Sequence, residues 1–486
     1  MLYMKNLPIE DGKYLLKEGI NLEFKSGLKG VPDSFYDTYS SFANTFGGRI
    51  VLGIRDGTNE IEGVNNPEQR VQDIWNALNN VQVVNENILL PEDIWTFESP
   101  FGTLIIVDVP RADRYLRPIY HRRLETGTFK RNGEGDFRCR MTEIAAMLRD
   151  KSDITYDSTI LEDMDYSDID LDTLHSFRNF MSVHNPGHGW NAADDQVFAE
   201  KMGITARKGG KVYLTVAGLV MFGKEYRIYR EFPRYKLDYR EYGDGGTEWT
   251  FRLVTGDGQW EGNVFNYYIR VSNRITSELD TPLEIGKDMV RIEDTDSHKA
   301  IRELLLNALI HADYRGNLTV YAERRKNRII ISNSGLFRIP LTEAENGGNS
   351  DPRNVLIAKM FSMIGLVERA GVGVNYVMRI WERDHNVQPR IIEDTEHDSV
   401  TAELPIGVRE KVNTRESKII ELMASNPKIT AAEMSRIIGV SVPTISNTIK
   451  AMTSRGLIVR KGGPKGKWVV VADYPTYGEQ KVDFAN

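Results

Sequence analysis

The segment 297–314 constrains the fold of this chain more than any other part of the sequence. Its apolar residues recur at helical spacing after Ser297, a residue that can cap the helix, so one side can be buried against a core. Glu303 and Asn307 lie one turn apart and project together from the opposite side. A carboxylate beside a carboxamide suits a base next to a ligand for a hard metal ion. Such a pair alone is more typical of a solvent-exposed helix face, so its meaning depends on the segments that follow.

Two glycine-containing turns follow this helix along the chain. A buried strand pattern runs into a turn that contains Asn333 and Gly335. Gly371 and Gly373 then precede another helical pattern. Glycines at such a turn let backbone N–H groups approach a phosphate at the positive end of the helix dipole. Helix, strand and phosphate turn in this order indicate a nucleotide-binding site.

This ordered set of motifs resembles the ATP site of the gyrase, Hsp90, histidine-kinase and MutL fold, also called the GHKL or Bergerat fold. The closer resemblance is to the variant found in transcriptional regulators once described as RecG-related. It implies an α/β sandwich over residues 290–410 that binds ATP together with Mg²⁺. Glu303 would match the carboxylate that activates the attacking water, and Asn307 the Mg²⁺ ligand that bridges the phosphates. A retained glutamate favours ATP hydrolysis over simple phosphate donation.

The same resemblance implies roles for the residues of the two turns. Asn333 stands where most of the superfamily has the aspartate that accepts a hydrogen bond from the adenine amino group, and its side-chain oxygen can accept that bond. Gly335 would allow the base to approach closely, while Gly371 and Gly373 would form the phosphate turn. The segment 345–351 lies where this fold often carries its ATP lid.

A second group of motifs lies within residues 1–150. A strand pattern that contains Glu23 and Lys25 precedes a helical aromatic stripe and a Gly-Gly turn, and a buried strand then runs into the Asp-Gly turn at Asp56. Together with the segment 127–133, these motifs resemble the AlbA-like domain of the Schlafen family. The resemblance implies an α/β domain that binds nucleic acid.

In the Schlafen family, three acidic positions can form a metal-dependent ribonuclease site, and they correspond here to Glu18, Glu23 and Asp56. Three carboxylates around Mg²⁺ or Mn²⁺ would orient water for attack on a phosphodiester. Lys25 and Arg131 would hold the phosphates. Glu18 and Glu23 are five residues apart, so a straight strand would send them to opposite faces unless the intervening glycine bends the chain. Binding of DNA or RNA without cleavage is therefore the preferred expectation, and a nuclease is the alternative.

Short helical patterns near the C-terminus predict a winged helix-turn-helix domain over 411–475, with a tail at 476–486. Thr430 can cap a helix that ends at Gly439, a second helix follows, and a basic hairpin forms the wing. This arrangement resembles bacterial winged-helix repressors and implies DNA as a partner, although some winged helices dock proteins or form dimers. The residues expected to face the major groove are Ser441, Thr444, Asn447 and Lys450. The wing residues expected to neutralise phosphates are Arg460, Lys461, Lys465 and Lys467.

Composition limits the remaining possibilities. The chain has 486 residues and a net charge of −7, which argues against a protein coated by nucleic acid and confines such contacts to local surfaces. Cys139 is the single cysteine, so no internal disulfide can form and a reducing compartment is expected. No signal peptide or membrane-spanning stretch is recognisable, and we expect a cytoplasmic protein without a membrane partner.

The expected fold class is α+β with several domains. Two segments complete the domain organisation. Residues 151–172 form an acidic run that is expected to act as a linker. Residues 173–289 carry no motif with a chemical interpretation and are expected to form a connecting domain.

We expect an ATP-binding and DNA-binding transcriptional regulator. Binding of Mg-ATP would order the lid and favour a homodimer, which would place paired winged helices on a palindromic site. A second hypothesis is an ATP-gated, metal-dependent nuclease effector that defends against foreign nucleic acid, including that of phage. A third hypothesis is an ATPase that acts as an adaptor by docking protein partners.

Overall fold

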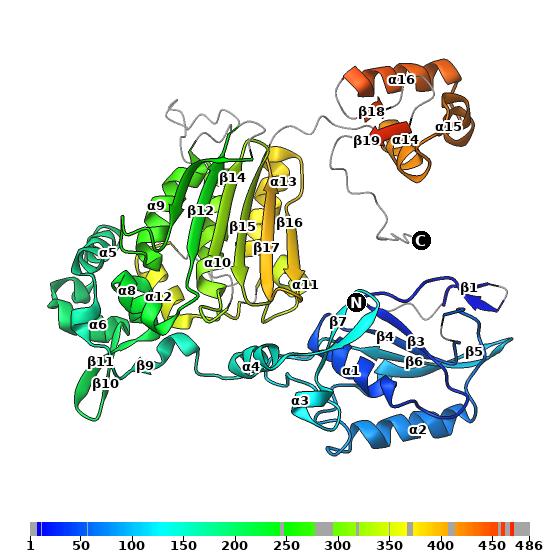
Figure 1. The fold of residues 1–486 in the computed structure, drawn as a ribbon, viewed down its shortest axis with the longest axis horizontal. Helices are drawn as coiled ribbons and strands as arrows, with labels where there is room; N and C mark the ends of the chain where they lie inside the picture. Colours follow the sequence, from blue (N-terminus) through cyan, green and yellow to red (C-terminus); the bar gives the residue numbers. More distant parts are fainter. Residues whose placement is uncertain are drawn as a thin grey trace. The chain divides into compact units, whose positions relative to one another are not determined.

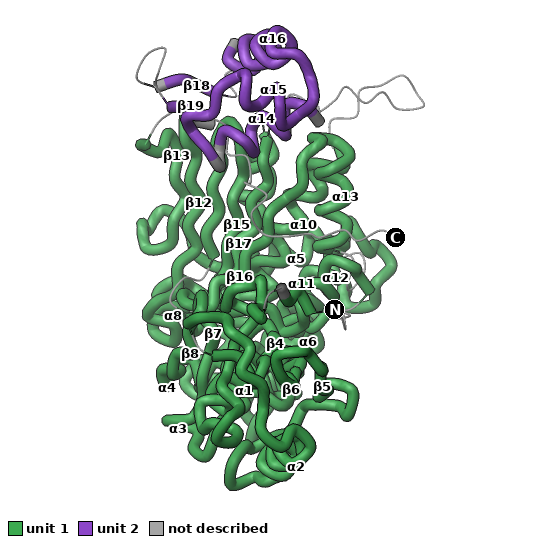
Figure 2. Tube along the Cα trace, turned by 90° about the vertical axis from the view of Figure 1, so that its right-hand side faces the viewer, with its two compact units in different colours: residues 1–406 green, residues 407–486 purple. Residues whose placement is uncertain are grey.

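The computed structural model of this chain divides into two compact units, residues 1–406 and 407–486 (Figure 2). Both units combine helices and strands, which confirms the predicted α+β multidomain class. The residues that the structure describes are 7–10, 12–55, 57–243, 247–277, 295–316, 320–348, 350–366, 373–406, 414–454, 458–461 and 467–470. Within these ranges, no helix has the length and apolar character that a membrane span requires.

The N-terminal domain (residues 7–150) is built on a four-stranded sheet with two helices on one face (Figure 1). Its elements are β3 (Leu22–Lys25), β4 (Gly48–Leu52), β6 (Gly102–Val109), β5 (Ile94–Ser99), α1 (Ser34–Asn44) and α2 (Pro67–Leu78). β4 pairs in parallel with β3 and antiparallel with β6. Ile50 and Leu52 of β4 pack beneath the helices, and Val51 packs on the other face. A strand buried on both faces explains the continuous apolar run in the sequence.

A six-stranded sheet with three helices on one face forms the centre of the first unit (Figure 1). In spatial order, its strands are β13 (Trp249–Val254), β12 (Leu237–Tyr242), β14 (Val320–Arg325), β15 (Arg328–Ser334), β17 (Ser399–Pro405) and β16 (Arg390–Asp394). The helices are α9 (Val264–Thr276), α10 (Asp296–His311) and α13 (Gly373–His385). β12 and β14 pair in parallel, and the other neighbours pair antiparallel. The strands β12 and β13 and the helix α9 belong to this structure. They precede residue 290, where the predicted nucleotide domain begins.

Helix α10 buries its apolar side between the sheet and its two neighbouring helices, in agreement with the sequence pattern. Ile301, Leu305 and Leu309 have no exposed surface. Thr295 rather than Ser297 occupies the N-cap position. Ser297 lies inside the first turn, where its hydroxyl donates a hydrogen bond of 2.7 Å to Asp384 of α13 and ties the two helices together.

A mainly helical region lies between these two sheets along the chain. The last helix of the N-terminal domain, α4 (Met141–Asp150), leads into this region. The elements of the region are β9 (Ile160–Leu161), α5 (Leu171–His184), α6 (Asp195–Met202), β10 (Thr205–Lys208), β11 (Lys211–Thr215), α7 (Val216–Phe222) and α8 (Glu225–Glu231), joined later by α12 (Val355–Met363). The acidic run at 151–172 is packed into this region rather than extended as a linker. The buried Asp157 carboxylate accepts hydrogen bonds from the backbone N–H groups of Leu356 and Ile357, at 2.7 and 3.1 Å. Two of its acidic residues, Asp157 and Asp168, are therefore buried parts of this region, while most of the others remain exposed.

A buried arginine joins the N-terminal sheet to a hairpin formed by β7 (Phe129–Asn132) and β8 (Gly135–Arg138). Arg131 has no exposed surface. Its guanidinium contacts Glu23 of β3 at 2.7 Å and Asp136 of β8 at 2.9 Å. The sequence predicts a phosphate contact for Arg131, but the structure places its side chain inside the domain. Its donors neutralise two carboxylates there instead.

The second unit contains three helices and a two-stranded hairpin in the predicted order. Its elements are α14 (Thr414–Ser425), α15 (Ala431–Ile438), α16 (Val442–Ser454), β18 (Ile458–Lys461) and β19 (Lys467–Val470). Thr430 caps α15 as predicted, because its hydroxyl accepts from the Glu433 N–H while the Glu433 carboxylate accepts from the Thr430 N–H. Gly439 ends the helix at a φ of 78°, a conformation that favours glycine. The sequence therefore specified the local structure of this unit closely.

We expect the substitution Arg131→Met to destabilise the first unit by about 3–5 kcal/mol, because it leaves the Glu23 and Asp136 carboxylates without their buried partner. Urea unfolding of the full chain would measure this loss. The matched control is Arg122→Met, which removes an exposed ion pair with Asp33 of 2.9 Å and should cost at most about 1 kcal/mol. Equal losses in the two variants would contradict the role assigned to Arg131.

Candidate nucleotide site and nucleic-acid surfaces

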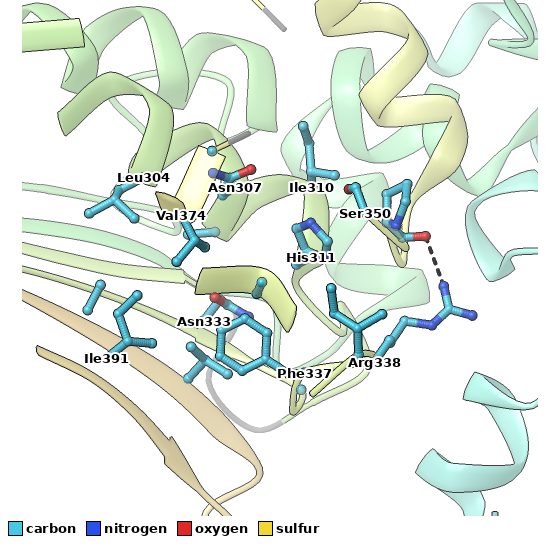
Figure 3. A pocket seen from close by; sticks show the side chains of 18 of the residues that line it. Leu304, Asn307, Ile310, His311, Asn333, Phe337, Arg338, Ser350, Val374 and Ile391 are labelled. Atoms are coloured by element: carbon cyan, nitrogen blue, oxygen red, sulfur yellow. Dashed lines mark hydrogen bonds between the residues drawn. The ribbon is translucent and has the colours of Figure 1, made fainter. Parts of the chain in front are cut away.

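A cavity lies between helix α10 and the six-stranded sheet, and it brings together the residues predicted to bind a nucleotide. Its empty space, including the opening to solvent, is about 1200 Å³. Figure 3 shows α10 side chains on one side of it and Asn333, from β15, on another. The predicted residues that line it are Glu303, Asn307, Asn333, Gly335 and Gly373. Gly371 lies outside the described residues.

The polar end of this cavity is formed by the carboxylate and carboxamide of α10. The Asn307 side-chain nitrogen donates a hydrogen bond of 3.2 Å to Glu303. The first residue of α13, Gly373, lies directly against this pair: a Cβ there would be 2.5 Å from both side chains. Glycine therefore allows the N-terminus of α13 to approach Glu303 and Asn307. A carboxylate, an amide oxygen and a helix N-terminus together fit a hydrated divalent cation with a phosphate.

The other end of the cavity is mostly apolar and suits a planar base. Ile331, Phe337 and Ile391 line it. The nearly buried Asn333 uses its side-chain nitrogen to donate to the neighbouring backbone carbonyl at 2.9 Å. No described residue donates to its side-chain oxygen, which leaves this acceptor for a ligand amino group.

Gly335 is required by its own turn, for a reason that the sequence did not reveal. Its φ is 89°, and its N–H donates a hydrogen bond of 2.7 Å to the Asp398 carbonyl. A Cβ at this position would lie 2.7 Å from the guanidinium carbon of Arg353. The absence of a side chain at Gly335 therefore leaves space for the Arg353 guanidinium as well as for a ligand.

His311 is a cavity residue that sequence reasoning missed. It lies one turn beyond Asn307 on α10, and its imidazole lines the cavity between Asn307 and Phe337 (Figure 3). Burial, followed by repulsion from Arg353 and Arg338, lowers its pKa to about 4. The ring is therefore neutral at pH 7 and can both donate and accept a hydrogen bond. His311 follows Asn307 at the same four-residue spacing that separates Glu303 from Asn307. This spacing in the sequence could have identified it.

Hydrogen-bonded ion pairs connect the N-terminal domain to the rim of this cavity. Arg114 pairs with Asp351, which lines the cavity. Asp150, the last residue of α4, forms two hydrogen bonds with Arg353, at 2.9 and 3.0 Å. Arg353 also donates to the backbone carbonyl of His311 at the end of α10. The end of α10 and the N-terminal domain therefore share one arginine, Arg353.

The acidic residues predicted for a nuclease site are engaged within the N-terminal domain. The Glu23 carboxylate contacts Lys25 at 2.5 Å and Arg131 at 2.7 Å. The Glu18 carboxylate accepts a hydrogen bond of 2.8 Å from the backbone N–H that follows Glu23. No cluster of three His, Cys, Asp or Glu residues that could hold a metal ion occurs in the described part of the chain. Asp56 lies outside that part.

Three of the predicted DNA-reading positions lie on α16, the second helix of the helix-turn-helix, and Ser441 directly precedes it. Ser441, Asn447 and Lys450 are exposed, and Thr444 is partly buried. The hydroxyl groups of Ser441 and Thr444 lie 2.8 Å apart at the start of the helix. An exposed polar face of this kind is available for a nucleic-acid groove.

The predicted phosphate contacts lie on the hairpin that follows. Arg460 of β18 is exposed, with its guanidinium 4.7 Å from the centre of the Trp468 ring. Lys461 ends β18, and the exposed Lys467 begins β19. Lys465 lies outside the described residues. The described cations therefore sit on both strands of the wing.

We expect His311 to reduce stability at acidic pH. Its pKa is about 4 in the folded chain and near 6.5 when unfolded, so the unfolded state binds more protons below pH 6.5. Relative to His311→Gln, the wild-type chain should lose about 2 kcal/mol between pH 7.5 and 5. Urea unfolding of both proteins at each pH would measure this difference. A constant difference would show that the imidazole titrates normally.

Family models match four segments of the chain. Residues 18–140 match "Schlafen, AlbA_2", and residues 145–238 match "Domain of unknown function (DUF8451)". Residues 320–403 match "Putative ATP-dependent DNA helicase recG C-terminal", and residues 413–459 match "Winged helix-turn-helix DNA-binding". No curated protein matches the chain.

Two solved structures are similar to this chain. The DIP2311 protein from Corynebacterium diphtheriae is 18% identical with a TM-score of 0.41, covering 95% of this chain and 94% of that one. The N-terminal domain of a RecG-related protein from Nitrosomonas europaea is 25% identical with a TM-score of 0.20, covering 26% and 87%. At these TM-scores neither structure informs the function. The family models show that the chain combines a Schlafen AlbA_2 domain, an ATPase-like domain of the RecG C-terminal family and a winged helix-turn-helix domain.

Proposed function

We propose that this protein is an ATP-binding, DNA-binding regulator in which Mg-ATP controls nucleic-acid engagement by its terminal domains. The observation that carries the proposal is the Glu303–Asn307 pair, which lies in a cavity against Gly373 at the start of α13. That arrangement would supply a base, a metal ligand and backbone N–H groups at one end of a mostly apolar pocket.

Each cavity residue has a distinct part in this proposal. Asn307 would ligate Mg²⁺, which, when bound, neutralises charge on the phosphates. Glu303 would hold a water molecule and remove its proton. Asn333 would accept a hydrogen bond from the base, and the neutral His311 would donate or accept one beside it. Closure of the segment 345–351 would exclude solvent from these groups.

Coupling to the N-terminal domain would run through the cavity rim. Asp351 lines the cavity and pairs with Arg114, while Arg353 joins Asp150 to the end of α10. A change at the rim on nucleotide binding would therefore alter contacts with the N-terminal domain. We propose nucleic-acid binding there without cleavage, since Glu23 is already neutralised by two cations. The homodimer remains a prediction.

Substitutions in the α10 pair should separate nucleotide binding from turnover. Asn307→Ala should lose Mg-ATP binding, because the metal ligand is removed. Glu303→Gln should keep binding and lose ATP hydrolysis by about 10²-fold or more, because the general base is removed. Calorimetry and a phosphate-release assay would measure the two effects.

The matched control for this pair is Asn327→Ala in the exposed turn between β14 and β15. Binding and turnover should remain at the wild-type level in this variant. Unchanged turnover in Glu303→Gln would remove the assigned role of Glu303, and retained Mg-ATP affinity in Asn307→Ala would remove that of Asn307.

The double substitution Arg460→Ala and Lys461→Ala should weaken duplex DNA binding similarly across sequences. Each phosphate contact contributes about 0.9 to the slope of log K against log salt, so the slope should fall by about 2. Titrations of labelled duplexes at several salt concentrations would measure it. Lys418→Ala, which removes an exposed cation from α14, serves as the control and should leave the slope unchanged. An unaltered slope in the double variant would favour the adaptor hypothesis.

A further inference from the structure

A second cavity lies where the N-terminal domain meets the rim of the nucleotide cavity, and the function proposed above does not use it. Its empty space, including its opening, is about 580 Å³, less than half the 1200 Å³ of the nucleotide cavity. The N-terminal domain contributes three cationic residues to its lining, Arg114, Arg117 and Lys130. Leu336 and Phe337 line both cavities and separate them. The second cavity therefore suits a small ligand.

Arg117 is the cation in this cavity that lacks a partner. Only 6% of its surface is exposed, and its Nε atom is buried without a hydrogen bond. No hydrogen bond or salt bridge joins its guanidinium to another described residue. Burial, followed by repulsion from Arg111, lowers its pKa to about 10, so the group stays charged at neutral pH. A buried charge without a partner is costly, and an anion in the cavity would remove that cost.

Three carboxylates act electrostatically on Arg117 without bonding to it, and each has another partner: Asp113 accepts a hydrogen bond of 2.8 Å from the backbone N–H of Tyr115. Asp150 forms hydrogen bonds of 2.9 and 3.0 Å with Arg353. Glu393 forms hydrogen bonds of 2.8 and 2.9 Å with Arg111. Two-pronged pairs of this kind satisfy both partners. Arg117 is therefore left to bind something that is not part of the chain.

The other charged residues that line the cavity are also paired, with one exception. Arg114 bonds Asp351, and Lys130 bonds Glu143 at 2.6 Å. The exception is Asp398, whose carboxyl group takes part in no hydrogen bond or ion pair with another described residue. Burial raises the pKa of Asp398 above its usual value. A cavity with a guanidinium donor and a carboxylate acceptor suits a ligand that can both accept and donate hydrogen bonds.

We propose that this cavity binds inorganic phosphate in its monohydrogen form. Two phosphate oxygens would accept hydrogen bonds from the Arg117 guanidinium, and the P–OH group would donate to the Asp398 carboxylate. Sulfate has the same charge and shape but carries no proton at neutral pH. Its oxygens would meet the Asp398 carboxylate with no hydrogen between them, so Asp398 selects phosphate over sulfate. The inference stands independently of the proposed ATP site.

Calorimetric titration of the full chain with sodium phosphate and with sodium sulfate, at matched ionic strength and pH 7.5, tests the proposal. Phosphate should bind at one saturable site, and sulfate should bind at least tenfold more weakly. Arg117→Met should lose phosphate affinity by about 10²-fold, the effect of losing one or two charged hydrogen bonds. Arg123→Met, which removes an exposed arginine of the same domain, should bind as the wild type does.

The substitution Asp398→Asn provides a second, independent measurement. Its φ is 51°, a conformation that asparagine also adopts, so the backbone should be preserved. The asparagine can donate to sulfate, so the preference for phosphate should disappear. This loss of selectivity would test the proposal even if Arg117→Met failed to fold.

Three results would overturn the assignment. One is the absence of saturable phosphate binding to the wild-type chain. Another is unchanged affinity in Arg117→Met, and the third is unchanged selectivity in Asp398→Asn. Asn307→Ala distinguishes the two cavities, because it should lose Mg-ATP while keeping phosphate. Loss of phosphate in Asn307→Ala would place the anion in the nucleotide cavity instead.

Discussion

The burial of one side of α10 is the constraint on which the candidate nucleotide site depends. Ile301, Leu305 and Leu309 are completely buried, and each contributes about 1.5–3 kcal/mol relative to an exposed position. Rotation of the helix by one residue would swing this side out of the core. The opposite side therefore has a fixed direction, and Glu303 and Asn307 face the cavity because their apolar neighbours cannot move.

Apolar burial fixes the direction of α10. Electrostatic contacts in the same way fix how the N-terminal domain contacts the rest of the first unit. The position of Arg353 is fixed, because its guanidinium donates hydrogen bonds to Asp150 and to the backbone carbonyls of His311 and Leu336. Buried ion pairs add little net stability compared with apolar residues, but each one specifies a partner and a direction. Gly335 completes this arrangement because its missing side chain leaves space for the guanidinium.

The sequence predicted those features that are determined by neighbours along the chain. The buried side of α10, the cap at Thr430 and the turn at Gly439 are all local, and each is present in the structure. His311 is equally local, but a single histidine forms little sequence pattern of its own. Its lowered pKa depends on burial and, to a lesser extent, on two arginines from distant segments, which periodicity cannot show.

Features that depend on distant partners were not predictable in the same way. Glu23 and Arg131 are separated by 108 residues, so their ion pair could not be read from either motif. The parallel pairing of β12 with β14 extends the central sheet before residue 290, although no motif in that region indicates it. The acidic run 151–172 was expected to act as a linker, but Asp157 is buried against backbone N–H groups of α12. In each case a single chain segment gives no information about its partner.

The parallel pairing of β12 with β14 also affects how the chain is made. The hairpin of β12 and β13 can form early, because Arg252 and Asp238 bond across it at 2.7 and 3.0 Å. The strand β14, which covers the other edge of β12, ends at Arg325, roughly 70 residues after the end of β13, and a ribosome needs about 4–14 s to add them. Until then that edge of β12 has no neighbour in the sheet, so the nascent chain must delay completion of its central sheet and is exposed to chaperones during that interval.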